Sequence, residues 1–321
     1  MAQLVKLQDY VSRYEFDVYR YPSQFVRLKK QQWEKVKYQW ESGEMEEKPV
    51  TPEIIEIEKV SVKNKLFSFL KKKEEEASLP EREVYKEPED ELEVDMGIYT
   101  DIQSLEELKK IFLDQIFKFQ LKWASSTILE KSYVDNSYHY DERLRYLLQR
   151  FPDNTLVFYC PILKIKNAPV ELEVILLTPT EVWLLSFLEF EDGAAYIGSP
   201  ERFWTKKWAE KEEKVLNPVI SLKRMESLIG QILSHAEIDL PVQKGLISRN
   251  GYIDYPRAPI GIQFIDKRRH DQWFQQLRNS RSPIKGVQLK AAQALTEYCT
   301  TTSFRRVQWE DHSVVDEQDE E

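Results

Sequence analysis

Apolar residues are concentrated in residues 170–198, VELEVILLTPTEVWLLSFLEFEDGAAYIG. Two apolar runs there, Val174–Leu177 and Val182–Phe190, are separated by Thr178-Pro179-Thr180. β-Branched and aromatic residues favour strands, and proline at the second position of a turn favours chain reversal. Because each run is almost continuously apolar, it is typical of a strand covered on both faces. The pattern therefore predicts two neighbouring central strands.

Helical spacing of apolar residues dominates much of the remaining chain. Residues 2–41 carry apolar stripes at three- and four-residue intervals and are predicted to be mostly helical, with a break at Tyr21-Pro22. Ser104-Leu105-Glu106-Glu107 matches the capping-box pattern that starts a helix. Further helices are predicted at 105–123, 140–151, 219–235, 266–277 and 285–298.

Shorter β-rich runs complete the pattern. Strands are predicted at 155–164, 240–248 and 259–264, and Pro161 indicates a bulge or a sheet edge. The segment 199–217 fits either a β-hairpin or a short helix. Residues 138–280 thus alternate helices and strands in an order typical of an α/β or α+β domain of ordinary size.

Composition divides the chain into four parts. Residues 1–41 are predicted to be a helical N-terminal region and residues 42–97 a charged, partly disordered linker rich in proline and charge runs. Residues 98–298 are predicted to hold the α/β domain with a leading and a trailing helix, and residues 299–321 an acidic disordered tail.

Charge and cysteine content indicate the cellular environment of the protein and its partners. The net charge of −9 argues against broad attraction to nucleic acid or to an anionic membrane, but it leaves room for a local basic groove. Cys160 and Cys299 lie far apart without metal spacing, which fits a reducing compartment. No signal-like or bilayer-length apolar run is present. We expect a cytoplasmic protein of a bacterial-type cytosol with no membrane partner.

Several common sites are not indicated. The four histidines share no ligand spacing, and no phosphate-binding or dinucleotide glycine motif occurs among only nine glycines. His270-Asp271 fits a helix surface better than a catalytic dyad. The basic and aromatic residues of 27–40 suggest either a nucleic-acid face or an ordinary solvated helix, and a charge run on a helix usually marks the latter.

A set of short motifs follows a fixed order within residues 138–280. In chain order they are Tyr140-Asp141-Glu142-Arg143, Glu171-Leu172-Glu173-Val174-Ile175, Leu176-Leu177-Thr178-Pro179, Trp183-Leu184-Leu185-Ser186-Phe187-Leu188, Gly193, Gly198, Trp204 and Asn217-Pro218. This ordered set resembles the nuclease-related domain (NERD) family of the PD-(D/E)xK restriction-endonuclease-like class. The resemblance implies an α/β fold with a mixed sheet flanked by helices, here with a helical N-terminal extension.

The resemblance also implies a chemistry. Carboxylates at adjoining strand ends would bind Mg²⁺, which prefers oxygen ligands and lowers the pKa of the attacking water. A lysine two residues after the second carboxylate would share its strand face and stabilise developing charge. Glu142 corresponds to the helix glutamate of this pattern, and Glu173 stands where the family has an aspartate.

The sequence departs from the family at the second strand. Ser186-Phe187-Leu188 stands where the family has Glu-x-Lys, so a hydroxyl replaces a carboxylate and a leucine replaces the lysine. A shifted register would offer Glu189-Phe190-Glu191 but still no lysine. Glu142 could equally be an ordinary surface residue, and Glu173 could be solvated or paired with Lys164 or Lys166.

Three hypotheses follow. The first is a non-catalytic nuclease-fold protein that binds nucleic acid or protein, with Glu142, Glu173 and Ser186 as vestigial site positions and no cofactor. The second is a Mg²⁺-dependent nuclease that uses Glu142, Glu173 and an acidic group from 189–192. The third is a protein-only adaptor or oligomerisation protein. The sequence favours a protein that is not an active enzyme; DNA or a protein is the expected partner, and the oligomeric state stays open.

Overall fold

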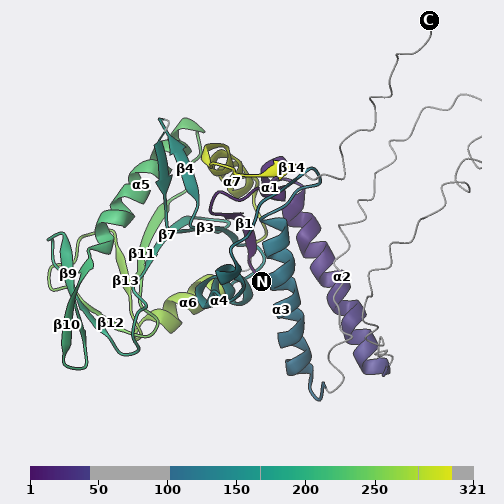
Figure 1. Ribbon diagram of the computed structural model, residues 1–321, viewed down its shortest axis with the longest axis horizontal. Coiled ribbons are helices and arrows are strands. Elements are labelled where there is room, and N and C mark those ends of the chain that lie inside the picture. The colour runs from purple at the N-terminus through teal and green to yellow at the C-terminus, as the bar shows by residue number, and fades with distance from the viewer. Residues whose placement is uncertain (44–101, 167, 281, 306–321) are drawn as a thin grey trace, which may run out of the picture.

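The computed structural model describes residues 1–43, 102–166, 168–280 and 282–305 (Figure 1). Most of the predicted linker 42–97 and residues 306–321 of the predicted tail lie outside the described residues. The described chain is a mixed α/β structure built around a six-stranded sheet. This architecture confirms the coarse prediction of a mixed sheet flanked by helices.

The six-stranded sheet combines parallel and antiparallel pairs. Its strand order is β1-β3-β6-β7-β11-β13, in which β3, β6 and β7 are antiparallel neighbours, whereas the pairs β1–β3, β7–β11 and β11–β13 are parallel. The strands are β1 (Gln3–Leu7), β3 (Leu156–Tyr159), β6 (Val174–Leu177), β7 (Val182–Phe187), β11 (Val242–Ile247) and β13 (Gln263–Ile265).

Helices cover both faces of this sheet (Figure 1). The apolar side chains of α5 and α7 pack with one face, together with Leu184. Those of α4 and α6 pack with the opposite face, together with Leu185. The helices are α1 (Arg13–Phe16), α2 (Tyr21–Ser42), α3 (Leu105–Trp123), α4 (Glu142–Arg150), α5 (Pro218–His235), α6 (His270–Arg278) and α7 (Gly286–Tyr298).

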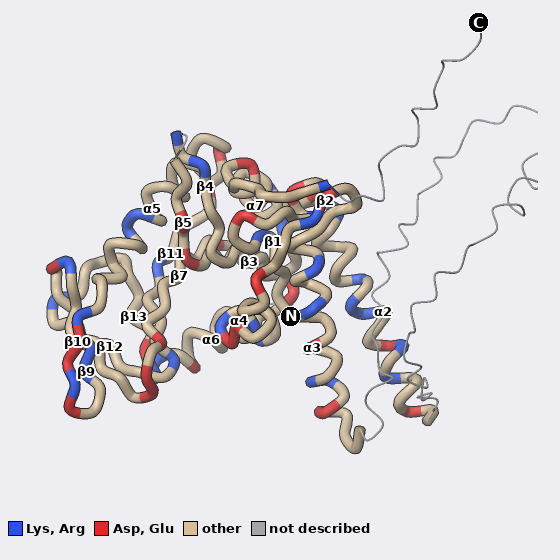
Figure 2. Tube along the Cα trace, viewed as in Figure 1, with Lys and Arg blue, Asp and Glu red and all other residues tan. Residues whose placement is uncertain are grey.

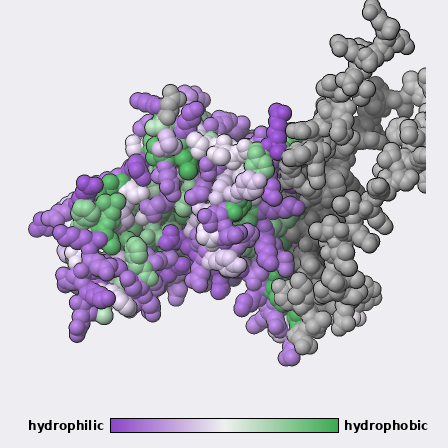
Figure 3. All heavy atoms as spheres, in the orientation of Figure 1, coloured by the Kyte–Doolittle hydropathy of each residue, from purple (hydrophilic) through white to green (hydrophobic). Residues whose placement is uncertain are grey.

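A second sheet of four strands has the order β10-β9-β8-β12 and forms one end of the molecule (Figure 1). Its strands are β8 (Ala195–Ile197), β9 (Phe203–Trp208), β10 (Lys211–Leu216) and β12 (Tyr252–Asp254). β9 carries Lys206 and Lys207, and β10 carries Glu212 and Glu213 between Lys211 and Lys214 (Figure 2). The visible surface of the molecule is mostly hydrophilic, with small apolar patches over this end (Figure 3).

Two small pairs of strands complete the fold. They are β4 (Ile162–Ile165) with β5 (Ala168–Glu171), and β2 (Glu130–Lys131) with β14 (Phe304–Arg305). The predicted strand 155–164 is therefore two strands, because the chain takes a left-handed conformation at Cys160 (φ 49°) just before Pro161. Among the described residues, no helix combines the length and apolar character needed to cross a lipid bilayer.

The prediction of a mostly helical 2–41 is wrong at its start. Gln3–Leu7 is a strand, and all five residues are buried. Leu4 and Leu7 contact one apolar cluster and Val5 the other. The pairing with β3 shifts register between Leu4 and Lys6, so the three-residue spacing of Leu4 and Leu7 arises from a bulged strand rather than from a helical stripe. The amide of Gln120 on α3 accepts from Leu4 N at 2.7 Å and donates to Ala2 O at 3.0 Å. That side chain thus satisfies backbone groups at an outer strand of the sheet.

The central prediction is confirmed. β6 and β7 are antiparallel neighbours, and every residue of both strands is buried. The segment 199–217 forms the β9–β10 hairpin rather than a helix. Helix α5 starts at Pro218 with Asn217 as its cap, since the Asn217 side chain accepts from Val219 N at 3.0 Å. Helix α6 begins four residues later than predicted, at His270, because the Asp266 side chain instead accepts from Arg268 and from Ile253 N.

The predicted basic and aromatic face of α2 is mostly occupied by packing. Trp33 lies 5.1 Å from Phe112 on α3 between ring centroids, and Trp40 Nε1 donates to Ile102 O at 3.1 Å. Lys29 pairs with Asp153 at 2.8 Å. These contacts favour the ordinary-helix interpretation of residues 27–40.

Candidate functional site

Glu173 and Ser186 lie opposite each other on neighbouring strands. Val174 on β6 pairs with Leu185 on β7, so Glu173, which precedes Val174, lies beside Ser186, which follows Leu185. Ser186 Oγ donates to Glu173 Oε1 at 2.9 Å, and Phe187 N donates to Glu173 Oε2 at 3.4 Å. Both carboxylate oxygens therefore accept hydrogen bonds from β7 rather than pairing with Lys164 or Lys166.

The β7 side of this pair is shielded from solvent. Ser186 is 2% exposed and Leu188 is 4% exposed. The backbone N–H of Leu188 donates to Ile247 O on β11 at 2.8 Å, which holds this residue against the sheet. The two positions where the resembled family carries a carboxylate and a lysine thus hold neutral, buried side chains.

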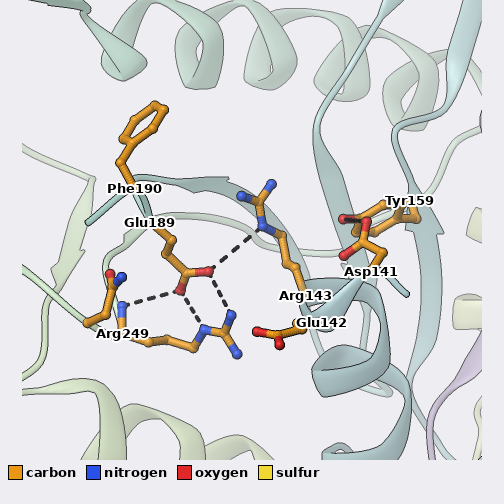
Figure 4. Close-up of a pocket in the computed structure, with 8 residues that line it drawn as sticks. Asp141, Glu142, Arg143, Tyr159, Glu189, Phe190 and Arg249 are labelled. Carbon is orange, nitrogen blue, oxygen red and sulfur yellow. Dashed lines mark hydrogen bonds and ion pairs between the residues drawn. The ribbon is translucent and has the colours of Figure 1, made fainter. Parts of the chain in front are cut away.

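Glu142 lies in a neighbouring pocket of about 600 Å³. It is the first residue of α4 and is exposed. The lining of the pocket includes Glu142, whereas Glu173 and Ser186 lie outside it. The lining residues are Asp141, Glu142, Arg143, Tyr159, Glu189, Phe190, Arg249 and Asn250 (Figure 4). The structure therefore brings two of the three predicted site residues together and places the third in a separate environment.

Glu189 is the central charge of the pocket (Figure 4). Its side chain is only 8% exposed. Arg249 contacts both of its oxygens, with Nε at 2.5 Å from Oε1 and Nη2 at 2.7 Å from Oε2. Burial by itself would lower the pKa of Arg249, but the hydrogen bonds and the charge of Glu189 outweigh burial and raise it. The pair is a two-pronged ion pair, which fixes the guanidinium plane.

Arg143 approaches the same carboxylate from α4. Its Nε lies 3.8 Å from Glu189 Oε2, too far for a hydrogen bond, and this buried nitrogen has no hydrogen-bond partner in the described chain. The guanidinium lies over the Phe187 ring, 4.8 Å from its centroid. The buried Oδ1 of Asn250 also lacks a partner there. The pocket thus holds a guanidinium and an amide oxygen with unused hydrogen-bonding capacity.

Asp141 serves the local fold instead. Its side chain caps α4 by accepting from Leu144 N at 2.9 Å, and it accepts from the Tyr159 hydroxyl at 2.6 Å. Burial, followed by this bond to Asp141, raises the pKa of Tyr159. Both side chains are therefore held in place as a wall of the pocket.

Aromatic groups support Arg249 from outside the pocket. Its guanidinium lies 4.3 Å from the centroid of the Tyr146 ring, and the Tyr146 hydroxyl lies 2.8 Å from Nε2 of His270. Burial lowers the pKa of His270 below its usual value. His270 Nδ1 is 3.5 Å from Asp271, whose side chain is fully exposed. The histidine therefore belongs to the support of an arginine rather than to a dyad that faces a substrate.

Lys206 and Lys207 on β9 are engaged in ion pairs at the four-stranded sheet. Lys206 pairs with Glu191 at 2.8 Å and with Glu213 at 2.7 Å, and Lys207 pairs with Glu212 at 2.6 Å. Within the described ranges, no three His, Cys, Asp or Glu side chains are grouped as a metal site requires. Both cysteines are free, and burial raises the pKa of each thiol to about 12.

The sequence indicated Glu189 only within a group of acidic residues and missed Arg249. A usable signal existed, because Arg249-Asn250 directly follows the predicted strand 240–248. Charged residues that follow a buried strand lie close to those that follow a parallel neighbouring strand. β11 and β7 are parallel neighbours, and their following residues Arg249 and Glu189 are the ones that pair.

Comparison with known proteins gives a short match. A stretch of 42 residues is 60% identical to an RNA 2′,3′-cyclic phosphodiesterase of Geobacillus stearothermophilus, and it covers 13% of this chain and 13% of that protein. No family model matches the chain, and no solved structure matches it.

Proposed function

We propose that this chain is a nuclease-fold protein that binds the backbone of a nucleic acid without cutting it. The observation that carries the proposal is the hydrogen bond between Ser186 and Glu173 on neighbouring buried strands. Two positions of the resembled motif meet as that motif requires, but their polar atoms satisfy each other. The order α4, β3, β6, β7, α5, β11 follows the order of the motifs that carry the resemblance.

The residues do not fit a catalytic Mg²⁺ ion. Such an ion needs several oxygen ligands in near-octahedral geometry. Both oxygens of Glu173 already accept hydrogen bonds, and Ser186 contributes a neutral hydroxyl. Leu188 supplies neither charge nor a proton donor where a nuclease would use lysine. We therefore derive no cleavage step at this site.

The neighbouring pocket fits a phosphate group instead. Arg143 brings a guanidinium to the pocket, and planar guanidinium groups bind phosphate oxygens through paired hydrogen bonds. Arg249 is fixed beside it by Glu189 and Tyr146. Glu189 holds the two arginines in place, and a phosphate would add acceptors for the donor groups of Arg143. The 42-residue match to an RNA phosphodiesterase adds RNA to DNA as a ligand to test.

The first test separates binding from cleavage. Purified protein is mixed with labelled single- and double-stranded DNA and RNA in the presence and absence of Mg²⁺. We expect salt-dependent binding, because phosphate contacts release counterions, and no strand scission. Mg²⁺-dependent scission that Glu173→Ala abolishes would contradict the proposal.

The second test assigns the contact. Arg143→Gln removes the proposed phosphate ligand and should weaken binding uniformly across sequences and reduce the salt dependence by about one unit of slope. Lys30→Gln is the matched control, since Lys30 on α2 carries the same charge and its side chain is 75% exposed. Equal affinity of both variants and wild type, or binding of a protein ligand with no affinity for any nucleic acid, would refute the assignment.

A further inference from the structure

Only one face of the four-stranded sheet is covered by the rest of the molecule. Trp204 and Lys206 on β9, Tyr196 on β8 and Ile253 on β12 point inward and are at most 6% exposed. The registers place Lys206 opposite Tyr196, and Tyr196 opposite Ile253, so these side chains share one face. Because side chains alternate along a strand, their neighbours must project from the opposite, outer face.

Aromatic rings stand on that outer face. Phe203 on β9 is 46% exposed and Tyr252 on β12 is 40% exposed. The guanidinium of Arg202 lies 5.6 Å from the centroid of the Phe203 ring, and that of Arg268 lies 5.7 Å from the centroid of the Tyr252 ring. Each exposed ring therefore has its own cation beside it.

Counted with the two arginines beside its rings, this face has a small excess of positive charge. Lys207 on β9 and Lys214 on β10 project from it, and both are exposed. Its carboxylates are Glu212, which pairs with Lys207 at 2.6 Å, and Asp254. Arg268 is also paired with Asp266, so four cations lie beside three carboxylates and the local charge is about +1, in a chain with a net charge of −9.

We infer that this outer face, which carries Phe203, Lys207, Lys214 and Tyr252, binds single-stranded nucleic acid. Bases would stack on Phe203 and Tyr252, and the lysines and flanking arginines would contact the phosphates. Tyr252 on β12 lies two strands away from Lys207 on β9, at the same level of the sheet. Lys207 in turn is four residues along β9 from Phe203. With ~3.3 Å per residue and ~4.8 Å per strand, the two rings are about 16 Å apart, a span for a short run of nucleotides.

This surface extends the pocket already described. Asn250 lines the pocket, and Tyr252 follows it by two residues on the way into β12. A duplex keeps its bases stacked within the helix, so the two rings select unpaired strands. The inference goes beyond the proposed function, because stacking on the outer face does not require the pocket.

The experiment measures binding of a short labelled single strand of mixed sequence, as DNA and as RNA, to the full-length protein by fluorescence anisotropy. Phe203→Ala and Tyr252→Ala should each weaken binding at least about fivefold, because stacking on one ring stabilises a bound base by that much or more. Tyr252→Phe should bind like wild type. Tyr38→Ala is the matched control, since this tyrosine on α2 is 65% exposed and lies on another surface.

A second readout locates the strand directly. A strand that carries 5-iodouridine should cross-link under ultraviolet light to the peptides that contain Phe203 or Tyr252. Arg143→Gln separates the two proposals. If the Arg143→Gln variant loses binding while the Phe203→Ala variant binds like wild type, the pocket alone is supported and this inference is overturned. Tighter binding of duplex than of single strand, equal loss in Tyr38→Ala, or binding of a protein ligand alone also overturns it.

Discussion

The six-stranded and the four-stranded sheets differ in how completely the chain covers them. Every residue of β6 and β7 is buried between helices on both faces, whereas β9 and β10 expose most of their residues. In the covered sheet, the polar side chains of Glu173 and Ser186 satisfy each other. In the open sheet, lysines and aromatic rings keep access to solvent. The comparison indicates that Glu173 and Ser186 stabilise the covered sheet, whereas solvent-accessible charged and aromatic side chains lie at its edge and on the open sheet.

The largest expected effect is on stability in the covered sheet. Leu184→Ala on β7 removes a fully buried side chain and should lower the free energy of unfolding by about 2–5 kcal/mol, because it leaves a cavity. Leu216→Ala on β10, where the leucine is 58% exposed, should change it by no more than about 0.5 kcal/mol. Urea denaturation measures both. Similar losses in the two variants would mean that something covers the open sheet.

The next effect concerns the ion pair where the two sheets meet. Arg249→Ala leaves Glu189, 8% exposed, with only the distant Arg143 and should cost about 2–3 kcal/mol of unfolding free energy, less than a fully buried pair because Arg249 is partly exposed. Lys207→Ala breaks the exposed pair with Glu212 and should cost less than about 1 kcal/mol. Adding Glu189→Gln to Arg249→Ala should recover part of the loss; no recovery would show that packing on Tyr146, rather than charge, is what Arg249 supplies.

A smaller effect is expected at the Glu173–Ser186 pair. Ser186→Ala deprives Glu173 of one hydrogen bond in a dry position and should cost about 1–2 kcal/mol. Glu173→Gln keeps an acceptor for Ser186 and should cost less. Thermal unfolding ranks the two variants. The reverse order would indicate that the charge of Glu173 matters more than its hydrogen bond, which would favour a cation at this site.

The smallest effect is a pH dependence from His270. Because burial lowers its pKa in the folded protein below the usual 6.5, the unfolded chain binds a proton more readily. Stability from this group is therefore present above pH 6.5 and is lost as the pH falls through the lowered folded pKa. His270→Gln should flatten this part of the stability profile, measured by urea denaturation across that range. An unchanged slope would assign the pH dependence to other groups.

Much of the candidate site depended on contacts that no local pattern reveals. Glu173 and Ser186 were predictable as neighbours because a short Thr-Pro-Thr turn joins their strands. Glu142 was predicted to join them, yet its place at the start of α4 turns it toward a separate pocket. The Glu189–Arg249 pair joins residues that are 60 positions apart and became visible only when β7 and β11 were paired.

The sequence by itself determined the elements whose signals are local. The continuous apolar runs around Pro179 specified β6 and β7, and Asn217-Pro218 specified the start of α5. Only the tertiary structure decided that Gln3–Leu7 is a strand, because five residues with apolar groups on both faces fit a helix or a strand until β3 and Gln120 supply hydrogen-bond partners. It also decided which charges meet, since a guanidinium finds its carboxylate through strand pairing and not through proximity in sequence.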